Sequence, residues 1–166
     1  MSEEKKSFFP GRLSQVSVIV RDLDKAIANY KEVLGIEPTR VIEKSPAAPG
    51  KKYYNGKESD FFQRVALYYY GDVELEIQQP YGEASALSDF LKEHGEGVHH
   101  IAFDTLEFDK FHQHLEACGI PLIQSGPNSR SPYLHWGFYD AREKLGTMIE
   151  VTNFDEVKAI EAAQNK

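Results

Sequence analysis

Two carboxylates, an amide and an imidazole are the side chains of this chain best suited to act together chemically. They belong to Gln15, Glu76, His100 and Glu150. As a group they offer one nitrogen and three oxygen donors, a set that suits a divalent cation and leaves positions for two waters or for substrate. Any one of them alone is more often a solvated residue on a strand. The prediction of a metal site therefore depends on whether the fold brings the four together.

Each of the four lies in a stretch where polar and aliphatic residues alternate, which is the pattern of a strand with one buried face. In Gly97–Phe103, His99 shares a face with Ile101 and Phe103, whereas His100 points the other way. We interpret His99 as a packed, hydrogen-bonded core histidine. The aliphatic faces of the four strands are Val16, Val18 and Val20; Leu75 and Ile77; Ile101 and Phe103; and Ile149 and Val151. We expect these faces to pack on helices, which leaves the four polar residues on the opposite side.

The second half of the chain repeats the first. Gln15 is followed nine residues later by Asp24-Lys25, and His100 is followed nine residues later by Asp109-Lys110. A Gly-Ile pair then ends each predicted helix, at Gly35 and at Gly119. Each half reads as β-α-β-β-β, and such a repeat fixes the architecture. A pseudo-twofold axis between the halves would bring Gln15, Glu76, His100 and Glu150 to one point.

The predicted fold is therefore of the α+β class, with two βαβββ modules that form one curved mixed sheet around a metal cavity and helices outside. We expect a single domain over residues 1–166. Within it, the first module covers residues 13–80, a linker helix lies in 81–97, the second module covers 98–153, and a C-terminal helix covers 154–166.

The stretch Ser45–Ser59 contains two prolines, two glycines and several lysines, and it is predicted to be a long exposed loop. We expect that it can be shortened without unfolding the domain. Its lysines would attract an anionic substrate, although a merely solvated loop is the alternative.

Composition excludes several classes of function. The net charge is −7 and the pI is about 5.4, which argues against nucleic-acid binding and against a basic surface for anionic membranes. Cys118 is the only cysteine, so no intrachain disulfide forms, and we expect a cytoplasmic protein. No apolar run approaches the length of a membrane span. The charged stretch Met1–Lys6 is not followed by an apolar core, so we interpret it as a frayed tail and not as a signal peptide.

Several short motifs, in their order along the chain, resemble those of the vicinal oxygen chelate (glyoxalase/bleomycin resistance) superfamily, which includes glyoxalase I and methylmalonyl-CoA epimerase. The resemblance covers about Leu13 to Asn153 and rests on Leu13–Ala26, Tyr30–Gly35, Val73–Pro80, Gly97–Phe103 and Gly146–Val151. In that family four metal ligands lie on the first, fourth, fifth and eighth strands. Carried over, these positions are Gln15, Glu76, His100 and Glu150, the same four residues.

The resemblance implies a metal-dependent lyase or isomerase that moves a proton next to a carbonyl, with one divalent ion (Zn, Ni, Co or Mn) stabilising the enediolate charge. Methylmalonyl-CoA epimerase is the most similar subfamily from Glu76 to Ala102. Its general-base Glu on the third strand has no counterpart here, so we assign the base to Glu150, with Glu43 as a second candidate. Against glyoxalase I, the ligand set is similar, but Ile19 stands where an Arg would hold a glutathione carboxylate. We expect a small-molecule substrate, an acyl-CoA or a thiol adduct, and a homodimer.

Two other functions remain open from the sequence. A glyoxalase I-like lactoylglutathione lyase would use the same metal chemistry. A metal-free binding protein of the resistance type would instead stack a ligand on aromatic side chains, for which the candidates are Tyr68, Tyr70, Trp136 and Phe138. A ring-cleaving dioxygenase is disfavoured, because its iron site needs a second His where Gln15 stands. His112 and His114 have no matched partners in the repeat and are interpreted as surface or helix-packing residues.

Overall fold

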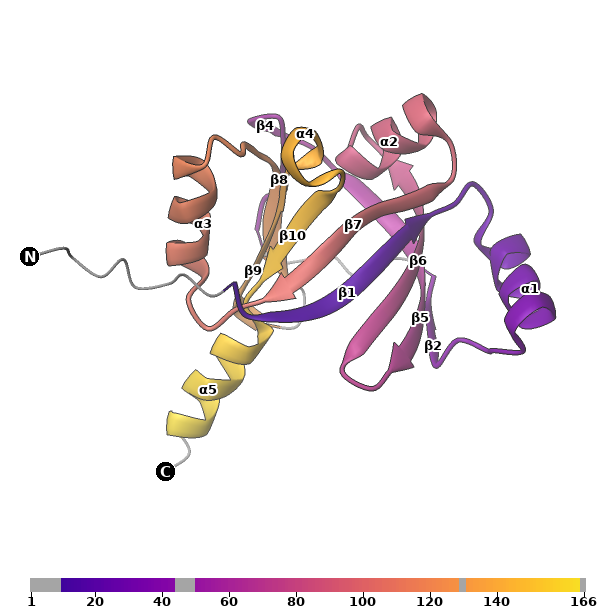
Figure 1. The fold of residues 1–166 in the computed structure, drawn as a ribbon, viewed down its shortest axis with the longest axis horizontal. Coiled ribbons are helices and arrows are strands. Elements are labelled where there is room, and N and C mark those ends of the chain that lie inside the picture. Colours follow the sequence, from indigo (N-terminus) through magenta and orange to yellow (C-terminus); the bar gives the residue numbers. More distant parts are fainter. Residues whose placement is uncertain (1–9, 44–49, 129–130, 165–166) are drawn as a thin grey trace, which may run out of the picture.

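The computed structural model describes residues 10–43, 50–128 and 131–164, and in them the strands form one ten-stranded sheet (Figure 1). The strands are β1 (Arg12–Ile19), β2 (Arg40–Ile42), β3 (Tyr53–Tyr54), β4 (Lys57–Glu58), β5 (Phe61–Tyr70), β6 (Val73–Gly82), β7 (Gly97–Asp104), β8 (Leu122–Asn128), β9 (Ser131–Tyr139) and β10 (Met148–Thr152). The helices are α1 (Leu23–Leu34), α2 (Ala86–His94), α3 (Phe108–Ala117), α4 (Arg142–Leu145) and α5 (Phe154–Gln164). The frayed tail predicted for Met1–Lys6 lies outside the described residues.

The order of strands in the sheet reflects the sequence repeat. One half reads β2-β5-β6-β1 and the other reads β7-β10-β9-β8, and the two halves join where β1 pairs with β7 antiparallel. In each half the first strand lies parallel to the last, β1 to β6 and β7 to β10. The predicted fold class, two βαβββ units in one curved mixed sheet with helices, is confirmed.

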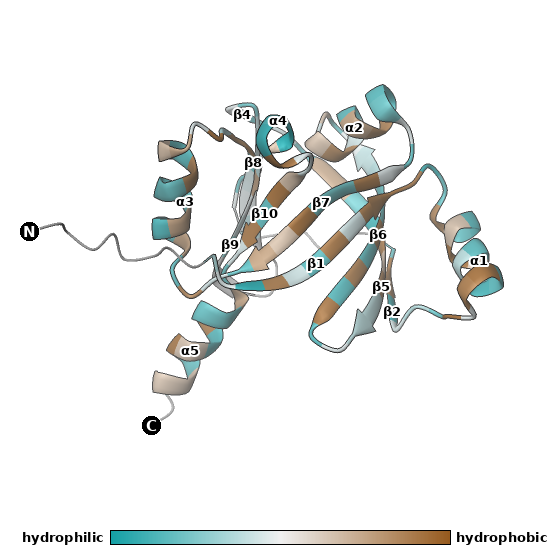
Figure 2. Ribbon diagram, in the orientation of Figure 1, coloured by the Kyte–Doolittle hydropathy of each residue, from teal (hydrophilic) through white to brown (hydrophobic). Residues whose placement is uncertain are grey.

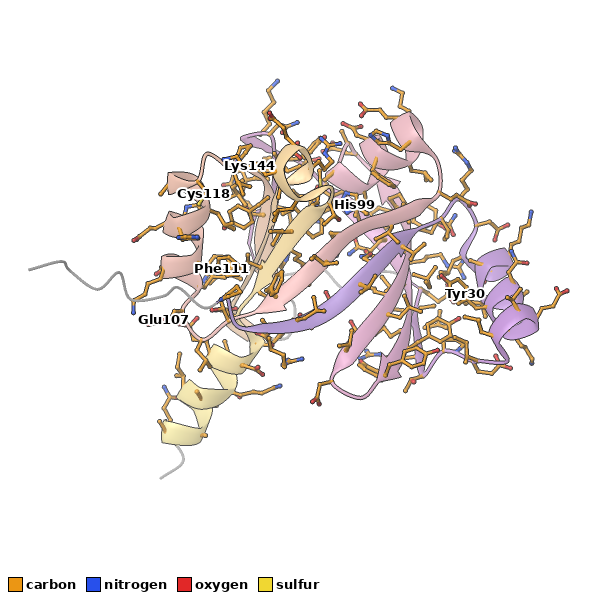
Figure 3. The ribbon with its side chains drawn as sticks, in the orientation of Figure 1. Tyr30, His99, Glu107, Phe111, Cys118 and Lys144 are labelled. Atoms are coloured by element: carbon orange, nitrogen blue, oxygen red, sulfur yellow. The ribbon has the colours of Figure 1, made fainter. Side chains whose placement is uncertain are left out.

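The aliphatic faces predicted from the alternation pack against α1 and α3, one helix for each half (Figures 1 and 2). Beneath α1, Leu23 and Ala26 meet Ile77 and the flanking Val18 and Leu75. The equivalent core beneath α3 contains Phe111, Leu115, Tyr139, Ile149 and Val151. Figure 3 shows Tyr30 of α1 and Phe111 of α3 in these two cores on opposite sides of the molecule.

A third core, which the sequence pattern did not predict, lies on the other face of the sheet. Here Ala86 and Leu87 of α2 pack against Ile19, Phe138 and Met148 from three strands of both halves. The linker helix therefore fills one end of the concave face and restricts the open cavity to the other end.

The prediction that Ser45–Ser59 is a long exposed loop is wrong for the part that the structure describes. Tyr53–Tyr54 and Lys57–Glu58 form a hairpin, and β3 pairs antiparallel with β8 at the edge of the second half. Asn55 and Gly56 both have positive φ, 49° and 74°, as the two central residues of a tight hairpin turn require. The hairpin, inserted between two strands of the first half, thus extends the sheet of the second. Residues 45–49 of the predicted loop lie outside the described residues.

In the second half, β8 continues through a Gly/Pro segment as far as Asn128, and the short helix α4 precedes β10. Among the described residues, no helix has both the length and the apolar character needed to cross a membrane.

Tyr54 is expected to anchor the inserted hairpin. Its ring joins the core beneath α2, and its hydroxyl donates to Asp89 of that helix at 2.7 Å. Tyr54→Ala should lower the free energy of unfolding by about 2–4 kcal/mol, somewhat below the usual cost of removing a fully buried aromatic ring. For a chain of this size each kcal/mol corresponds to about 2–4 °C in Tm. Tyr53→Ala is the matched control, because the neighbouring ring is 41% exposed, and an equal loss of Tm in both variants would contradict the anchoring role.

Candidate functional site

A cavity of about 130 Å³ opens on the concave face where the two halves meet. It is lined by residues from both halves: Gln15, Phe61, Gln63, Glu76, Gln78, Leu87, Gln124, Trp136, Phe138, Glu150, Thr152 and Phe154. Three of the four predicted ligands, Gln15, Glu76 and Glu150, are in this lining. The fourth, His100, is fully buried and its Nε2 lies 3.1 Å from Oε2 of Glu150.

The strand register places the four predicted ligands symmetrically. Gln15 pairs with Glu74 across the parallel β1–β6 ladder, and Glu76 lies two residues further on. His100 pairs with Met148 across the parallel β7–β10 ladder, and Glu150 again lies two residues further on. Because side chains alternate with a period of two, Gln15 and Glu76 share one face of the sheet, and so do His100 and Glu150. The equivalence of the two halves therefore holds at single-residue level.

Two small residues separate the predicted ligands. Ala102 of β7 lies between Gln15 and Glu150 in one row across the sheet, and Ser17 of β1 lies between Glu76 and His100 in the next row. Both are fully buried. Longer side chains at these two positions would stand between the four polar residues on this face of the sheet.

His100 and Glu150 form the most enclosed part of the site. Burial lowers the pKa of His100 to about 3 and raises the pKa of Glu150 to about 8. In the absence of a cation, both groups are therefore predominantly neutral at pH 7. Within the described residues, Nε2 of His100 has no hydrogen-bond partner despite its closeness to the carboxyl oxygen. A buried nitrogen without a partner marks a position where a further group is expected.

The other two predicted ligands have polar partners of their own. The amide of Gln15 donates to Glu74 at 2.5 Å, and a carboxylate oxygen of Glu76 accepts from the amide of Gln78 at 2.6 Å. In the part of the chain that the structure describes, no three His, Cys, Asp or Glu side chains are close enough together to form a ready-made metal cluster. The four residues thus share one face of the sheet without forming a closed coordination shell.

His99 does not lie where strict alternation predicts. Ser17 pairs with His100 and Val18 with Val98, so His99 is the extra residue of a β-bulge in β7. It is 2% exposed and packs on Phe90 of α2 and on Phe138. The bulge brings its ring to that of His100, with the two Nδ1 atoms 2.8 Å apart. The prediction that His99 shares a strand face with Ile101 and Phe103 is therefore wrong.

The structure does not bring Glu43 to the cavity. Its side chain is 71% exposed and accepts from Arg64, which also forms an ion pair with Asp24 at the start of α1. Of the aromatic residues proposed to stack on a ligand, Trp136 and Phe138 line the cavity. Tyr68 is buried in the core beneath α1, and Tyr70 is exposed.

Four further polar residues of the lining were not identified from the sequence: Gln63, Gln78, Gln124 and Thr152. The signal for two of them was present, because Gln78 lies two residues after Glu76 and Thr152 two residues after Glu150 on the same strand faces. Gln78 donates to Ser17 and Glu76, and the side-chain oxygen of Gln124 accepts from the backbone of Ala86. These hydrogen bonds hold the side chains of Gln78 and Gln124 in place in the wall of the cavity.

The raised pKa of Glu150 predicts a pH-dependent stability in protein freed of metal by a chelator. A carboxyl group whose folded pKa exceeds its unfolded value stabilises the fold below about pH 4.5, and this stabilisation is lost as the pH rises toward 8. Glutamine at position 150 cannot ionise. The Tm of Glu150→Gln should therefore rise relative to the Tm of the unaltered chain as the pH increases from 5 to 8.5. A constant difference across this range, in thermal unfolding followed by circular dichroism, would contradict the assigned pKa.

Comparisons with known proteins agree with this architecture. A family model described as the glyoxalase/bleomycin resistance protein/dioxygenase superfamily matches residues 14–137. The ethylmalonyl-CoA/methylmalonyl-CoA epimerase of Cereibacter sphaeroides is 28% identical over 117 residues, which is 70% of this chain and 77% of that protein. The mitochondrial methylmalonyl-CoA epimerase of Bos taurus is 30% identical over 95 residues, covering 57% of this chain and 46% of that protein.

Among solved structures, methylmalonyl-CoA epimerase from Streptomyces coelicolor in complex with 2-nitronate-propionyl-CoA has a similar fold. The TM-score is 0.62 at 20% sequence identity, over 86% of this chain and 94% of that one. The fold, the repeat and the family match, which covers most of the chain, lead to one conclusion: this chain belongs to the glyoxalase/bleomycin resistance protein/dioxygenase superfamily.

Proposed function

We propose that the protein is an epimerase-like enzyme that moves the proton alpha to the carbonyl of an acyl-CoA thioester with the help of one divalent metal ion. The observation that carries the proposal is the symmetric placement of Gln15, Glu76, His100 and Glu150 around the small residues Ser17 and Ala102. The similarity to methylmalonyl-CoA epimerases supports the choice of reaction.

The donor set fits a divalent ion. His100 Nε2 and Glu150 Oε2 lie 3.1 Å apart without a hydrogen bond between them. Two ligands at right angles, each bound at about 2.1 Å, are separated by roughly 3 Å, so this spacing is that of neighbouring ligands. Gln15 and Glu76 would supply further oxygens from the other half of the sheet. A cation there would also compensate the charge of the buried Glu150 carboxylate.

A bound metal ion would act as a Lewis acid toward the substrate's carbonyl oxygens. The chain's own residues have separate tasks. Glu150 borders both the metal position and the open cavity, so we assign to its carboxylate the removal of the alpha proton; the proton that completes inversion must reach the opposite face of the enediolate from a second donor. Phe138 and Trp136 form an apolar wall that restricts water near the reacting carbon. Gln63 and Gln124 offer amide groups to the polar parts of the substrate.

A second depression of about 200 Å³ adjoins the cavity and shares Gln15 and Phe154 with it. Arg12 and Lys158 contribute cationic side chains to this depression. Arg12 pairs with Asp104 and Asp155, Lys158 pairs with Asp155, and Asp72 and Glu74 also line the depression, so it offers no excess of positive charge for the phosphates of a coenzyme A moiety. Two lysines of the hairpin are engaged as well, because Lys51 pairs with Glu58 and Lys52 contacts the Phe61 carbonyl and ring.

A direct test compares two substrates on metal-loaded protein. Epimerisation of methylmalonyl-CoA, with no turnover of a glutathione hemithioacetal, would support the proposal. The reverse result would assign the protein to the glyoxalase I branch, with the same metal chemistry.

Metal-free ligand binding is the second candidate function. It is favoured by the absence of a ready-made cluster of ionisable ligands among the described residues and by the aromatic wall of Trp136, Phe138 and Phe61. Calorimetric titration of chelator-treated protein with planar aromatic compounds distinguishes the two. Micromolar binding that is unchanged by added metal would favour this alternative.

A further inference from the structure

His99 and His100 form a buried pair whose hydrogen bond has a consequence for the metal site. Their Nδ1 atoms lie 2.8 Å apart, and the rings are nearly perpendicular at an interplanar angle of 84°. Both side chains are buried, at 2% and 0% exposure. The β-bulge in β7 creates this contact, because neighbouring residues on a regular strand point to opposite faces.

The contact allows two arrangements of the shared proton. A ring nitrogen in such a bond either carries the hydrogen or accepts it. If His99 donates, His100 carries its own proton on Nε2, on the side of Glu150, and that nitrogen has no lone pair for a metal. If His100 donates from Nδ1, its Nε2 carries a lone pair that a metal ion could bind.

The position of Glu150 favours the second arrangement. With Nε2 protonated, the carboxyl oxygen 3.1 Å away would be the natural acceptor, yet the two atoms do not have hydrogen-bond geometry. The oxygen lies off the direction in which an N–H bond of His100 would point. A lone pair on Nε2 has no such requirement.

We propose that His99 is a positioning residue that accepts the Nδ1 proton of His100 and so holds the Nε2 lone pair of His100 toward the metal position. The proposal rests on the proposed metal site. A second group that fixes the tautomer of a ligating histidine typically contributes 10–100-fold to metal affinity. The packing of His99 on Phe90 and Phe138 holds its ring in place for this task.

Packing alone is the competing explanation for a buried histidine here. A phenylalanine would fill the same space between α2 and the sheet but has no acceptor nitrogen. An asparagine is smaller but offers a side-chain oxygen as acceptor. His99→Phe and His99→Asn therefore separate the hydrogen bond from the packing.

The first measurement uses the unaltered, metal-free full chain. Two-bond ¹H–¹⁵N correlation spectra of ¹⁵N-labelled protein report which nitrogen of each histidine carries the proton. The His100 signals are identified by their loss in His100→Gln. We expect His100 to be protonated on Nδ1, and protonation on Nε2 would overturn the proposal. This readout needs neither metal nor activity, so it is separate from a failure of the proposed function.

The second measurement is Zn²⁺ affinity, determined by competition with a chromogenic chelator. His99→Phe should bind Zn²⁺ about 10–100-fold more weakly, and His99→Asn should recover part of the loss. His112→Phe is the matched control, because His112 does not line the cavity. Its Nδ1 lies 2.9 Å from the hydroxyl oxygen of Tyr139, so this variant also removes a hydrogen-bonded histidine. Unchanged affinity in His99→Phe would reject the positioning role while leaving the metal site intact. If His99→Phe does not fold, His99→Asn and the spectrum of the unaltered chain still decide.

Discussion

Glu150→Gln should slow proton exchange at the alpha carbon of the substrate by about 10²–10⁴-fold, the usual contribution of a single general base. Glu150 is the carboxyl group that lies both beside His100 and in the lining of the open cavity. Glutamine keeps the size and one oxygen donor but cannot accept the proton. Exchange of a methylmalonyl-CoA proton for deuterium, followed by mass spectrometry, measures the effect.

The control for this variant is Glu143→Gln, which removes an exposed carboxylate from α4. It should exchange at the rate of the unaltered chain. Metal content must be measured in parallel, since Glu150→Gln is expected to keep part of its metal. Full exchange activity in metal-loaded Glu150→Gln would exclude this residue as the base.

His100→Ala should remove most of the bound metal, and Glu76→Ala should do the same from the other half of the sheet. These residues supply the imidazole nitrogen and one of the carboxylates of the donor set. Elemental analysis of protein purified without chelators gives the metal per chain. His94→Ala, which removes an exposed histidine of α2, is expected to retain the full content. Retention of metal in both His100→Ala and Glu76→Ala would mean that the ion lies elsewhere.

The positions of the two halves could be predicted because the repeat and the alternation are both local properties of the sequence. Val18 and Ile77 lie on the expected aliphatic face, and both pack beneath α1. The spacing of Gln15 and His100 from their following helices already implied the shared register that the strand pairs display. Such features follow from side-chain periodicity, which the sequence carries directly.

The bulge at His99 could not be predicted in the same way. It arises from the pairing of β7 with β1, which places two residues opposite one, and no residue type in Val98–Ile101 signals it. The same applies to the filling of the concave face by α2, because an amphipathic helix does not reveal which surface will cover its apolar side.

The inserted hairpin was missed for a different reason. Tyr53-Tyr54-Asn55-Gly56 contains an Asn-Gly pair after two aromatic residues, which is a strong hairpin signal. The surrounding prolines and lysines favoured a loop. What the local signal could not supply is the partner, since β3 pairs with β8 some seventy positions further along the chain.

Deuterium uptake from heavy water into methylmalonyl-CoA, with and without metal, tests the central claim most directly. The metal-loaded chain should place deuterium on the carbon next to the thioester carbonyl. Chelator treatment should abolish uptake, and added Zn²⁺, Ni²⁺, Co²⁺ or Mn²⁺ should restore it. Uptake that persists at the same rate in metal-free protein would contradict the proposed function.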